Sequence, residues 1–542
     1  MDENTLLLPQ YQGSDKQTTG SERRGRPCLW IAGALAATLL TLLLCTQLDR
    51  PAVHQLSSPA VGRFLHITDL HIDPHYTEGS TVYSQCHRKP PTNADDGHHS
   101  TGRFGIAGAK CDSPVPLINA TFEYLSGWAD QLDFVLWTGD SGRHDNDAEI
   151  PRTLDEIIEQ NRMAASKMAA VFKVPVVPNI GNNDISPHNE LPAPGHKRAR
   201  EAYKRLAGAW GSLVPRDQLA TFLHGGYFAR DIVNFEGGGG LTALSLNTMY
   251  WYQANAKVGG CKARDSPGLE QLAWIRYQIN RAKQRNRALV LIGHVAPTLS
   301  NYRPTCYHGY SRTVTQANSD RTVDVHAQLF GHSNVDVWAF VGQELEWDTE
   351  GSSGDRRLWW EREVDEESGR FGELIRTLWS AANETSLVAQ REGRMWEDME
   401  DDPVLPQALP SDFVETLLKE FEQVVNEPKK NAHLGVTTLS PSIIPKYVPA
   451  FRIFYYKKEE QTASSWARLP LGTLLDYDVY WADLPKLNKH SARGFFFQRL
   501  YRFSQVYQIN DLSLDSYLEW AKKLLGSKKL RRRFRSLTCL DT

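Results

Sequence analysis

The sequence predicts an α/β fold with helices on both faces of a sheet, because short apolar runs alternate with longer stretches of helical character. Each run has about five to seven residues and is bounded by glycine or polar residues, as is typical of strands buried on both faces. The expected strands span residues 64–68, 133–138, 174–180 and 288–292. The expected helices span residues 116–132, 154–172 and 268–285. Such an alternation packs helices against both faces of the sheet.

Composition and net charge exclude several classes of protein. The chain has 542 residues, of which 41% are hydrophobic and 23% charged, and its formal net charge is −3. The near balance of 61 basic and 64 acidic side chains excludes a globally basic nucleic-acid binder. Glycine and proline occur at ordinary frequencies without a repeat of solenoid length, which excludes collagen-like and repeat architectures. A prior of roughly 150 residues per domain allows three domains or one large α/β domain with insertions.

An apolar stretch near the N-terminus predicts a membrane span. Residues 27–48 contain no charged side chain, and as a helix they are long enough to cross about 30 Å of hydrocarbon. Arg23, Arg24 and Arg26 precede the stretch, which predicts that the N-terminus lies in the cytosol. A cleaved signal peptide is the main alternative, but the run exceeds the roughly 7–15 apolar residues of such peptides. A buried core helix is the third interpretation.

These signals divide the chain into five expected parts. They are a cytosolic tail (1–26), a signal-anchor span (27–48), a stalk (49–62), a lumenal folded domain (63–457) and a C-terminal region (458–542). Residues 344–402 hold 18 acidic against 7 basic side chains, which we interpret as a surface insertion. The basic block from Lys522 to Arg535 is typical of a disordered tail, although it could also recruit a polyanion or anionic lipid.

Cysteines and glycosylation acceptors agree with a lumenal domain. Asn119 and Asn383 stand in Asn-x-Thr sequons beyond the span. Cys28 and Cys45 lie in or beside the apolar stretch. The remaining cysteines are Cys86, Cys111, Cys261, Cys306 and Cys539. Proximity along the chain favours disulfides between the first two and between the next two, with the last unpaired, although the sequence does not fix the connectivity.

Polar side chains follow the apolar runs at the point where each expected strand ends. They are Asp69, His71, Asp140, Asn182, His294 and His332. Taken singly, each ending is explained by the solvation and capping of a loop. Ligand sites in α/β sheets, however, lie at the carboxyl ends of strands, and carboxylate, imidazole and amide groups are metal ligands. Several such endings in one chain therefore indicate a shared metal site.

The order of these motifs, D-x-H, G-D, G-N-x-D, G-H and G-H-x-N, resembles that of the calcineurin-like metallophosphoesterase superfamily. Within it, the closest resemblance is to the fungal endopolyphosphatase family, near the acid sphingomyelinase branch. The matching segments are residues 67–76, 138–145, 179–184, 245–248 and 330–334, and the resemblance covers roughly residues 63–457. It implies a β-sandwich flanked by helices. It also implies a type II membrane enzyme of the vacuole, with its catalytic domain in the lumen.

The resemblance further implies a centre of two divalent cations. The ligands of the first ion are expected to be Asp69, His71, Asp140 and Asn334. Those of the second ion are expected to be Asp140, Asn182, His294 and His332, so that Asp140 bridges the pair. Such donors suit Mn, Mg, Fe, Co or Zn. Two ions about 3.5–4 Å apart would clamp a phosphoryl oxygen and activate a water molecule.

Two catalytic positions depart from the usual superfamily pattern. Asn334 stands where the last motif usually has a histidine ligand, and its neutral amide should weaken the first metal and favour harder ions such as Mn or Mg. Asn183 stands where a histidine usually protonates the leaving group, which an amide cannot do. We expect His144, next to Asp145, to be the proton donor instead.

The implied substrate is inorganic polyphosphate, cut at internal phosphoanhydride bonds. Its leaving group is itself a phosphate, so the loss of one of two histidine acids is tolerable. We expect Arg143 and His75 to contact the substrate, whereas the basic residues between 196 and 205 resemble a solvated helix face. The alternatives are a sphingomyelinase-type phosphodiesterase and an inactive relative that binds polyphosphate. Vacuolar proteases are expected processing partners, and the oligomeric state is left open.

Overall fold

The computed structural model describes residues 56–90, 101–319, 325–342, 413–426, 434–460, 466–489 and 497–538. The expected cytosolic tail, membrane span and acidic insertion lie outside these residues, as do Asn383 and Cys539. Within the described ranges, none of the helices combines the length and apolar character needed to span a bilayer. The prediction of a span at residues 27–48 therefore stays a prediction.

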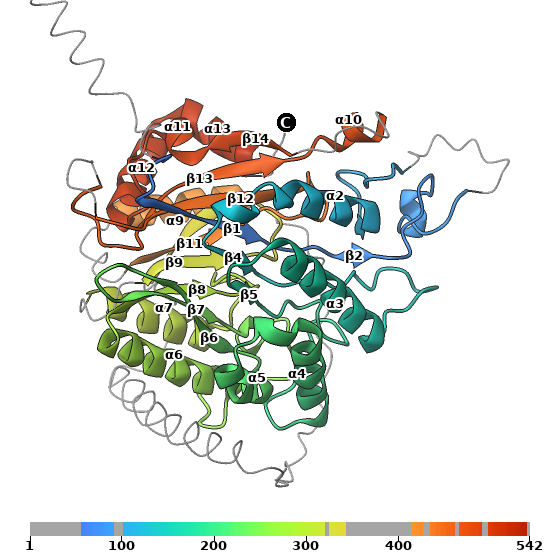
Figure 1. Cartoon of the computed structure of the whole chain (residues 1–542), viewed down its shortest axis with the longest axis horizontal. Coiled ribbons are helices and arrows are strands. Elements are labelled where there is room, and N and C mark those ends of the chain that lie inside the picture. The colour runs from blue at the N-terminus through green and yellow to red at the C-terminus, as the bar shows by residue number, and fades with distance from the viewer. Residues whose placement is uncertain are drawn as a thin grey trace, which may run out of the picture. The chain divides into compact units, whose positions relative to one another are not determined.

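The strands form two six-stranded sheets and one two-stranded ladder (Figure 1). The first sheet has the order β14-β13-β12-β1-β4-β5, with bounds Gln498–Arg502, Leu474–Trp481, Ala450–Lys457, Val61–Ile67, Phe134–Trp137 and Val176–Pro178. The second has the order β10-β11-β9-β8-β7-β6, with bounds Val337–Val341, Gly435–Leu439, Val325–Phe330, Arg287–Ile292, Gly240–Ser245 and Phe228–Asn234. The ladder pairs β2 (Ile72–Asp73) with β3 (Ser113–Pro114).

Helices cover the strands on two sides (Figure 1). On the upper side of the view are α2 (Val115–Ser126), α10 (Leu484–Lys489), α11 (Phe503–Tyr507), α12 (Leu514–Gly526) and α13 (Lys528–Thr538). On the lower side are α4 (Lys197–Trp210), α5 (Leu219–Gly225), α6 (Pro267–Gln284) and α7 (Pro304–Ser319). The others are α3 (Leu154–Val171), which contacts α2 and α4, and α9 (Phe413–Asn426), which contacts α12. Short 3₁₀ turns occupy Val82–Ser84, Ala129–Gln131, Gly211–Leu213, Arg216–Gln218 and Thr248–Tyr250.

Local sequence explains where the main helices begin. The Thr153 side chain accepts a hydrogen bond from the backbone of Glu156 at the start of α3, whose first turn is acidic, in keeping with the helix dipole. Ser266 caps α6 in the same way, and Pro267 supplies a first position that needs no N–H partner. The predicted helix at 116–132 ends earlier, at Ser126, and a separate 3₁₀ turn follows at Ala129–Gln131.

The four predicted strands exist, but they do not form a single sheet. Those at 64–68, 133–138 and 174–180 correspond to β1, β4 and β5, which pair in parallel. The strand at 288–292 is β8, and it pairs with β7 and β9 in the second sheet. Apolar runs cannot reveal this division, because a strand buried on both faces looks alike in either sheet. The carboxyl ends of both sheets contribute to the site described below.

The C-terminal region belongs to the same fold. Strand β12 pairs antiparallel with β1, and β13 pairs with β12, so the expected boundary at residue 457 falls inside the first sheet. The expected disordered tail is a further correction, because residues 528–538 form α13. Phe534 is only 2% exposed and packs 5.5 Å from the ring of Trp520. Leu530, Phe534 and Leu537 recur at helical spacing, which gives this basic segment an apolar stripe to bury.

Candidate metal centre

The expected ligands converge at the carboxyl ends of five strands, in both sheets. Loops after β1, β4 and β5 supply Asp69, His71, Asp140 and Asn182, and loops after β8 and β9 supply His294, His332 and Asn334. Two clusters of ligand atoms, Asp69–His71–Asp140 and Asp140–His294–His332, each fit within 4.8 Å. Asp140 belongs to both clusters, as the expected bridging ligand should.

One oxygen of Asp140 lies between the ligands expected for the first ion, which we call the near side or first half of the centre, and those expected for the second ion, which we call the far side or second half. Its Oδ2 is 3.4 Å from His71 Nε2 and 3.1 Å from His294 Nε2. On the far side, Asn182 Oδ1 is 2.9 Å from both His294 Nε2 and His332 Nδ1. On the near side, Asp69 Oδ1 is 3.6 Å from His71 Nε2, which is too long for a hydrogen bond. The two sides correspond to the two expected ions.

Unsatisfied oxygen atoms show that the site suits cations. Asp69 Oδ1 and Asn334 Oδ1 are buried and have no hydrogen-bond partner among the described residues. The amide nitrogen of Asn334 donates to the carbonyl oxygen of His332 at 3.1 Å. The amide oxygen of Asn334 therefore remains available as a metal ligand. Because buried polar atoms without partners cost free energy, their presence at this point indicates ligand atoms. The residues therefore fit a dinuclear centre of divalent ions.

Backbone strain is concentrated at the same residues. Ten non-glycine residues of the described chain have a positive φ, and five of them are expected ligands. These five are Asp69 (52°), His71 (37°), Asp140 (54°), His332 (70°) and Asn334 (58°). Left-handed backbone is uncommon for residues other than glycine, and Asp, Asn and His adopt it more readily than the other types; such conformations cluster at functional sites.

Surrounding groups orient the ligands. His71 Nδ1 donates to the carbonyl oxygen of Gly142 at 3.0 Å, and His294 Nδ1 donates to that of Thr138 at 2.7 Å. Both rings therefore present Nε2 to the centre. Asn183 donates twice to Asp140, from its backbone to Oδ1 at 2.8 Å and from its amide to Oδ2 at 2.9 Å. This predicted catalytic residue thus positions the bridging carboxylate.

Sequence reasoning missed Asp184, the last residue of the G-N-x-D motif. Its carboxylate is fully buried and accepts backbone hydrogen bonds from Asp140 and Gly181, both at 2.8 Å, and from Ser141 at 2.9 Å. It therefore joins the loop after β4 to the loop after β5. The motif contains this residue, but its spacing gives no sign that the Asp184 carboxylate binds backbone N–H groups and not metal.

The charges of the centre favour cations. Burial raises the pKa of Asp140, but the charge and hydrogen bond of His294 outweigh this and hold it well below the ordinary value. Burial lowers the pKa of His294, yet the charges of Asp140 and Asp69 raise it to about 9. Burial and the charge of His294 lower the pKa of His332 to about 4, so this ring is neutral. A metal ion would replace the proton of His294 as counter-charge to the two carboxylates.

His144 lies beside the first half of the centre. Its ring stacks on that of His71, with centroids 4.1 Å apart and an angle of 10°. Its Nδ1 lies 2.7 Å from Asp112 Oδ1, and its backbone N–H donates to the other oxygen of Asp112 at 2.7 Å. The expected neighbour Asp145 instead accepts from the backbone of Arg152 at 2.8 Å. Asp112, 32 residues away in sequence, is the carboxylate that orients His144.

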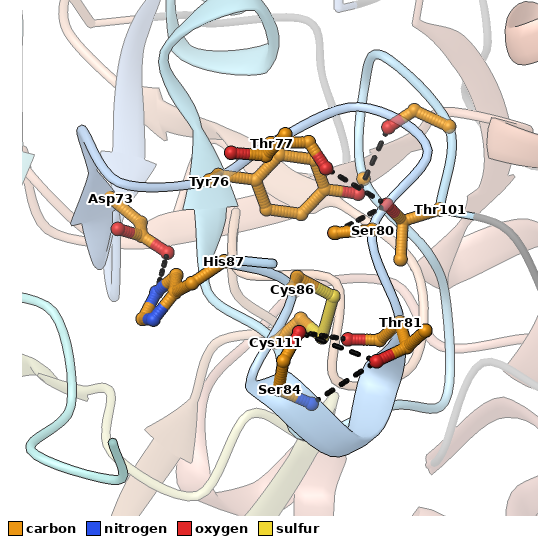
Figure 2. The surroundings of a disulfide bond; sticks show 12 residues. Asp73, Tyr76, Thr77, Ser80, Thr81, Ser84, Cys86, His87, Thr101 and Cys111 are labelled. Atoms are coloured by element: carbon orange, nitrogen blue, oxygen red, sulfur yellow. Dashed lines mark hydrogen bonds and ion pairs between the residues drawn. A yellow bond between two sulfur atoms is a disulfide. The ribbon is translucent and has the colours of Figure 1, made fainter. Parts of the chain in front are cut away.

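A disulfide anchors this arrangement (Figure 2). Cys111, which precedes Asp112, is bonded to Cys86, and the second expected disulfide, Cys261–Cys306, is also present. His87, which follows Cys86, lies 2.9 Å from Asp73 Oδ2 and 2.7 Å from Asp147 Oδ2. The disulfide therefore holds together two segments that are each bound to loops around the centre.

Of the two expected substrate contacts, Arg143 is not arranged as predicted, whereas that of His75, whose side chain is 37% exposed, stays a prediction. Arg143 is 1% exposed, and its guanidinium binds both oxygens of Glu156 and the carbonyl oxygens of His144 and Ile150. His75 Nε2 lies 3.2 Å from the same Glu156. Arg143 follows Asp140 closely in sequence, but its side chain turns inward and fastens the loop to α3. A buried guanidinium with this many internal acceptors is not available to a chain-like anion.

Two predictions from the sequence concern residues at the surface. On α4, Arg198 lies 3.7 Å from Glu190 and Arg205 lies 2.5 Å from Asp155, in agreement with a solvated face. Asn119 is exposed on α2, so its side chain is accessible for the attachment of a glycan.

Comparison with known proteins agrees with this geometry. The calcineurin-like phosphoesterase family model matches residues 62–336, which is half of the chain and contains every expected metal ligand. The chain belongs to the calcineurin-like phosphoesterase family. A dimetal phosphatase from Danio rerio superposes with a TM-score of 0.27 and 13% identity, covering 51% of this chain and 83% of that one, which is too remote to carry an argument.

Three fungal relatives of this phosphoesterase are named endopolyphosphatase. The protein from Cryptococcus neoformans is 34% identical over 482 residues, covering 81% of this chain and 64% of its own length. The protein from Schizosaccharomyces pombe is 32% identical, covering 79% and 69%. The protein from Saccharomyces cerevisiae is 36% identical, covering 51% and 40%. The chain thus spans about two thirds or less of the length of these relatives.

The charge of the centre predicts that divalent metal stabilises the folded phosphoesterase. Mn²⁺ at about 100 times its Kd should add about 2.7 kcal/mol to the free energy of unfolding, because the ion binds only the folded state. Asp140→Asn should abolish this effect, whereas Asp155→Asn, which alters an exposed carboxylate on α3, should retain it. Thermal unfolding with and without Mn²⁺ measures the difference. Equal stabilisation of all three proteins would contradict the assignment.

Proposed function

We propose that the protein is an endopolyphosphatase, a metal-dependent hydrolase that cuts internal phosphoanhydride bonds of inorganic polyphosphate. The observation that carries this proposal is the position of Asp140 Oδ2, within 3.4 Å of a histidine from each half of the centre. The names of the fungal relatives support the choice of substrate. We propose Mn²⁺ or Mg²⁺ as the ions, because Asn334 offers a neutral amide oxygen to the first of them.

The centre accounts for the hydrolytic step. When bound, two divalent ions would neutralise the charge of the attacked phosphoryl group and acidify a water molecule. Asp69, His71, Asp140 and Asn334 would hold one ion, and Asp140, Asn182, His294 and His332 the other. Asn183 keeps the shared carboxylate of Asp140 in place through two hydrogen bonds. Asp184 keeps the loops that carry Asp140 and Asn182 at a fixed separation.

His144 is the proton donor to the leaving phosphate in this proposal. Its Nδ1 is bound to Asp112, so Nε2 is the atom that would deliver a proton. Its stacking on His71 keeps the ring next to a residue that would hold the first ion. A leaving phosphate needs less protonation than an alkoxide, which agrees with a single histidine acid at this centre.

The cellular setting is part of the proposal. We place the catalytic domain in the vacuolar lumen, anchored by residues 27–48, with glycans on Asn119 and Asn383 and trimming by vacuolar proteases. Two disulfides suit an oxidising compartment. The complete set of ligands argues against an inactive relative, and nothing among the described residues favours the sphingomyelinase-type alternative.

Product lengths test the proposed activity. Purified protein should convert long-chain polyphosphate into a ladder of intermediate lengths when Mn²⁺ or Mg²⁺ is present, because an endo-cutting enzyme attacks internal bonds. Gel sizing of the products during the reaction makes the measurement. Chelator or Asp140→Ala should abolish the ladder. Release of single phosphates without intermediates, or no turnover of the metal-loaded protein, would refute the proposal.

The hydrogen bond from His144 to Asp112 predicts graded effects on the rate. His144→Ala should lower kcat on polyphosphate by about 10²–10⁴-fold, which is the usual contribution of a general acid. Asp112→Asn should lower kcat by about 10–100-fold, since it weakens the orientation of His144, and KM should change little. Steady-state kinetics measures both. Asp145→Asn is the matched control, and a loss as large as that of Asp112→Asn would contradict the assignment.

A further inference from the structure

Helix α13 presents an exposed surface made only of basic side chains. It consists of Lys528, Lys529, Arg532 and Arg533, which we call the basic face of α13. Their spacing places all four on one side of a helix. Helix α13 contains no acidic residue, and none of the four forms an ion pair with another residue in the described ranges. The positive charge of this face is therefore not neutralised by its neighbours.

The packing of α13 fixes the direction in which this face points. Phe534, on the opposite side of the helix, lies 5.5 Å from the ring of Trp520 on α12 and 6.2 Å from that of Phe421 on α9. Leu530 and Leu537 pack against the same core. Because the apolar stripe is buried, the basic face is held toward solvent in one orientation.

The basic face is unfavourable for the helix that carries it. Lys528 and Arg532 stand four residues apart, as do Lys529 and Arg533, and like charges at this spacing destabilise a helix. The two lysines also lie in the first turn of α13, where the helix dipole disfavours cations. Features that weaken local structure without a gain in packing are typical of functional sites.

The far end of α13 contacts a ligand loop of the metal centre. The carbonyl oxygen of Thr538, the last residue of the helix, accepts a hydrogen bond from the backbone N–H of Asp336 at 2.9 Å. Asp336 stands two residues after Asn334, an expected ligand of the first ion. With 11 residues, α13 is about 16 Å long. The basic face thus lies on a helix that leads to the loop carrying Asn334.

The chemistry of the basic face indicates its partner. A helix that binds a lipid surface inserts apolar side chains, but those of α13 pack inward. A single-stranded nucleic acid stacks its bases on aromatic side chains. Among the described residues, the exposed large apolar side chains are Tyr83 and Leu219, and neither belongs to α13. The basic face offers charge alone, which fits a flexible anion without bases or acyl chains.

We propose that the basic face of α13 binds inorganic polyphosphate at a distance from the bond that is cut, so that the protein holds a long chain at two places. This inference rests on the proposed function. A repeating anion can occupy both places, because every unit carries the same charge. Tripolyphosphate is too short to lie along α13 while one of its bonds is at the metal centre. The basic face therefore favours long chains over short ones.

A pair of substitutions on this face tests the binding. His144→Ala serves as the background, because it slows cutting. With Mn²⁺ present, Lys528→Gln/Arg532→Gln should weaken the binding of long-chain polyphosphate about tenfold at about 200 mM salt, measured by calorimetry. The slope of log affinity against log salt concentration should fall by about 1.4, because each contact of a flexible polyanion contributes about 0.7. Glutamine is a good helix former, so thermal stability should be retained.

Turnover supplies a second readout. In the otherwise unchanged protein, the same pair should raise KM for long-chain polyphosphate about tenfold and leave kcat nearly unaltered. The kinetic constants for tripolyphosphate should change less than about twofold. The matched control is Lys173→Gln/Lys283→Gln, which removes the same charge from exposed positions near the amino ends of β5 and β8, opposite the centre. This control should retain full affinity for the long chain.

The results also separate the possible partners. Unchanged affinity for long-chain polyphosphate in Lys528→Gln/Arg532→Gln, or an equal loss in the control pair, would overturn the proposal. If that unchanged affinity came with lost binding to phosphatidylserine vesicles, the basic face would belong to a membrane contact. If the wild-type protein leaves polyphosphate uncut, the proposed function fails, and the calorimetry still decides whether α13 binds the chain.

Discussion

The carboxylate of Asp140 is the constraint around which the site is built. It is fixed by two hydrogen bonds from Asn183 and by the contacts of Oδ2 with His71 and His294. The space around it is fully used: a Cβ atom at Gly181 would lie 2.0 Å from Asp140 Oδ1. Only glycine fits there, and the strained backbone of Asp140 persists because these neighbours leave no alternative.

The carboxylate of Asp140 can be shared by two metal ions only if the two sheets lie at a fixed distance from each other. The first sheet carries Asp69 and Asp140, and the second carries His294 and His332. A buried ion pair between Arg452 of β12 and Asp336, just before β10, joins the sheets close to the last ligand loop. Asp336 also accepts from Tyr501 of β14, and its backbone donates to Thr538 at the end of α13. Breaking such a buried pair is costly, so the C-terminal region helps to hold the ligand loop.

The sequence predicted the parts of the site that are local to one motif. The ligands follow apolar strands directly, so their residue types and order identified them without knowledge of the sheets. Asp112 was missed, because it reaches the centre from another loop, next to the disulfide between Cys86 and Cys111. Arg143 was misjudged for the opposite reason, since closeness in sequence to Asp140 does not fix the direction of a side chain.

Anomalous diffraction from crystals of the Mn²⁺-loaded protein tests the central claim most directly. The account predicts two anomalous peaks about 3.5–4 Å apart, one on each side of the Asp140 carboxylate. The first should have Asn334 Oδ1 as a ligand, and the second should have Asn182 Oδ1. A single peak, or a pair that does not share Asp140, would contradict the account.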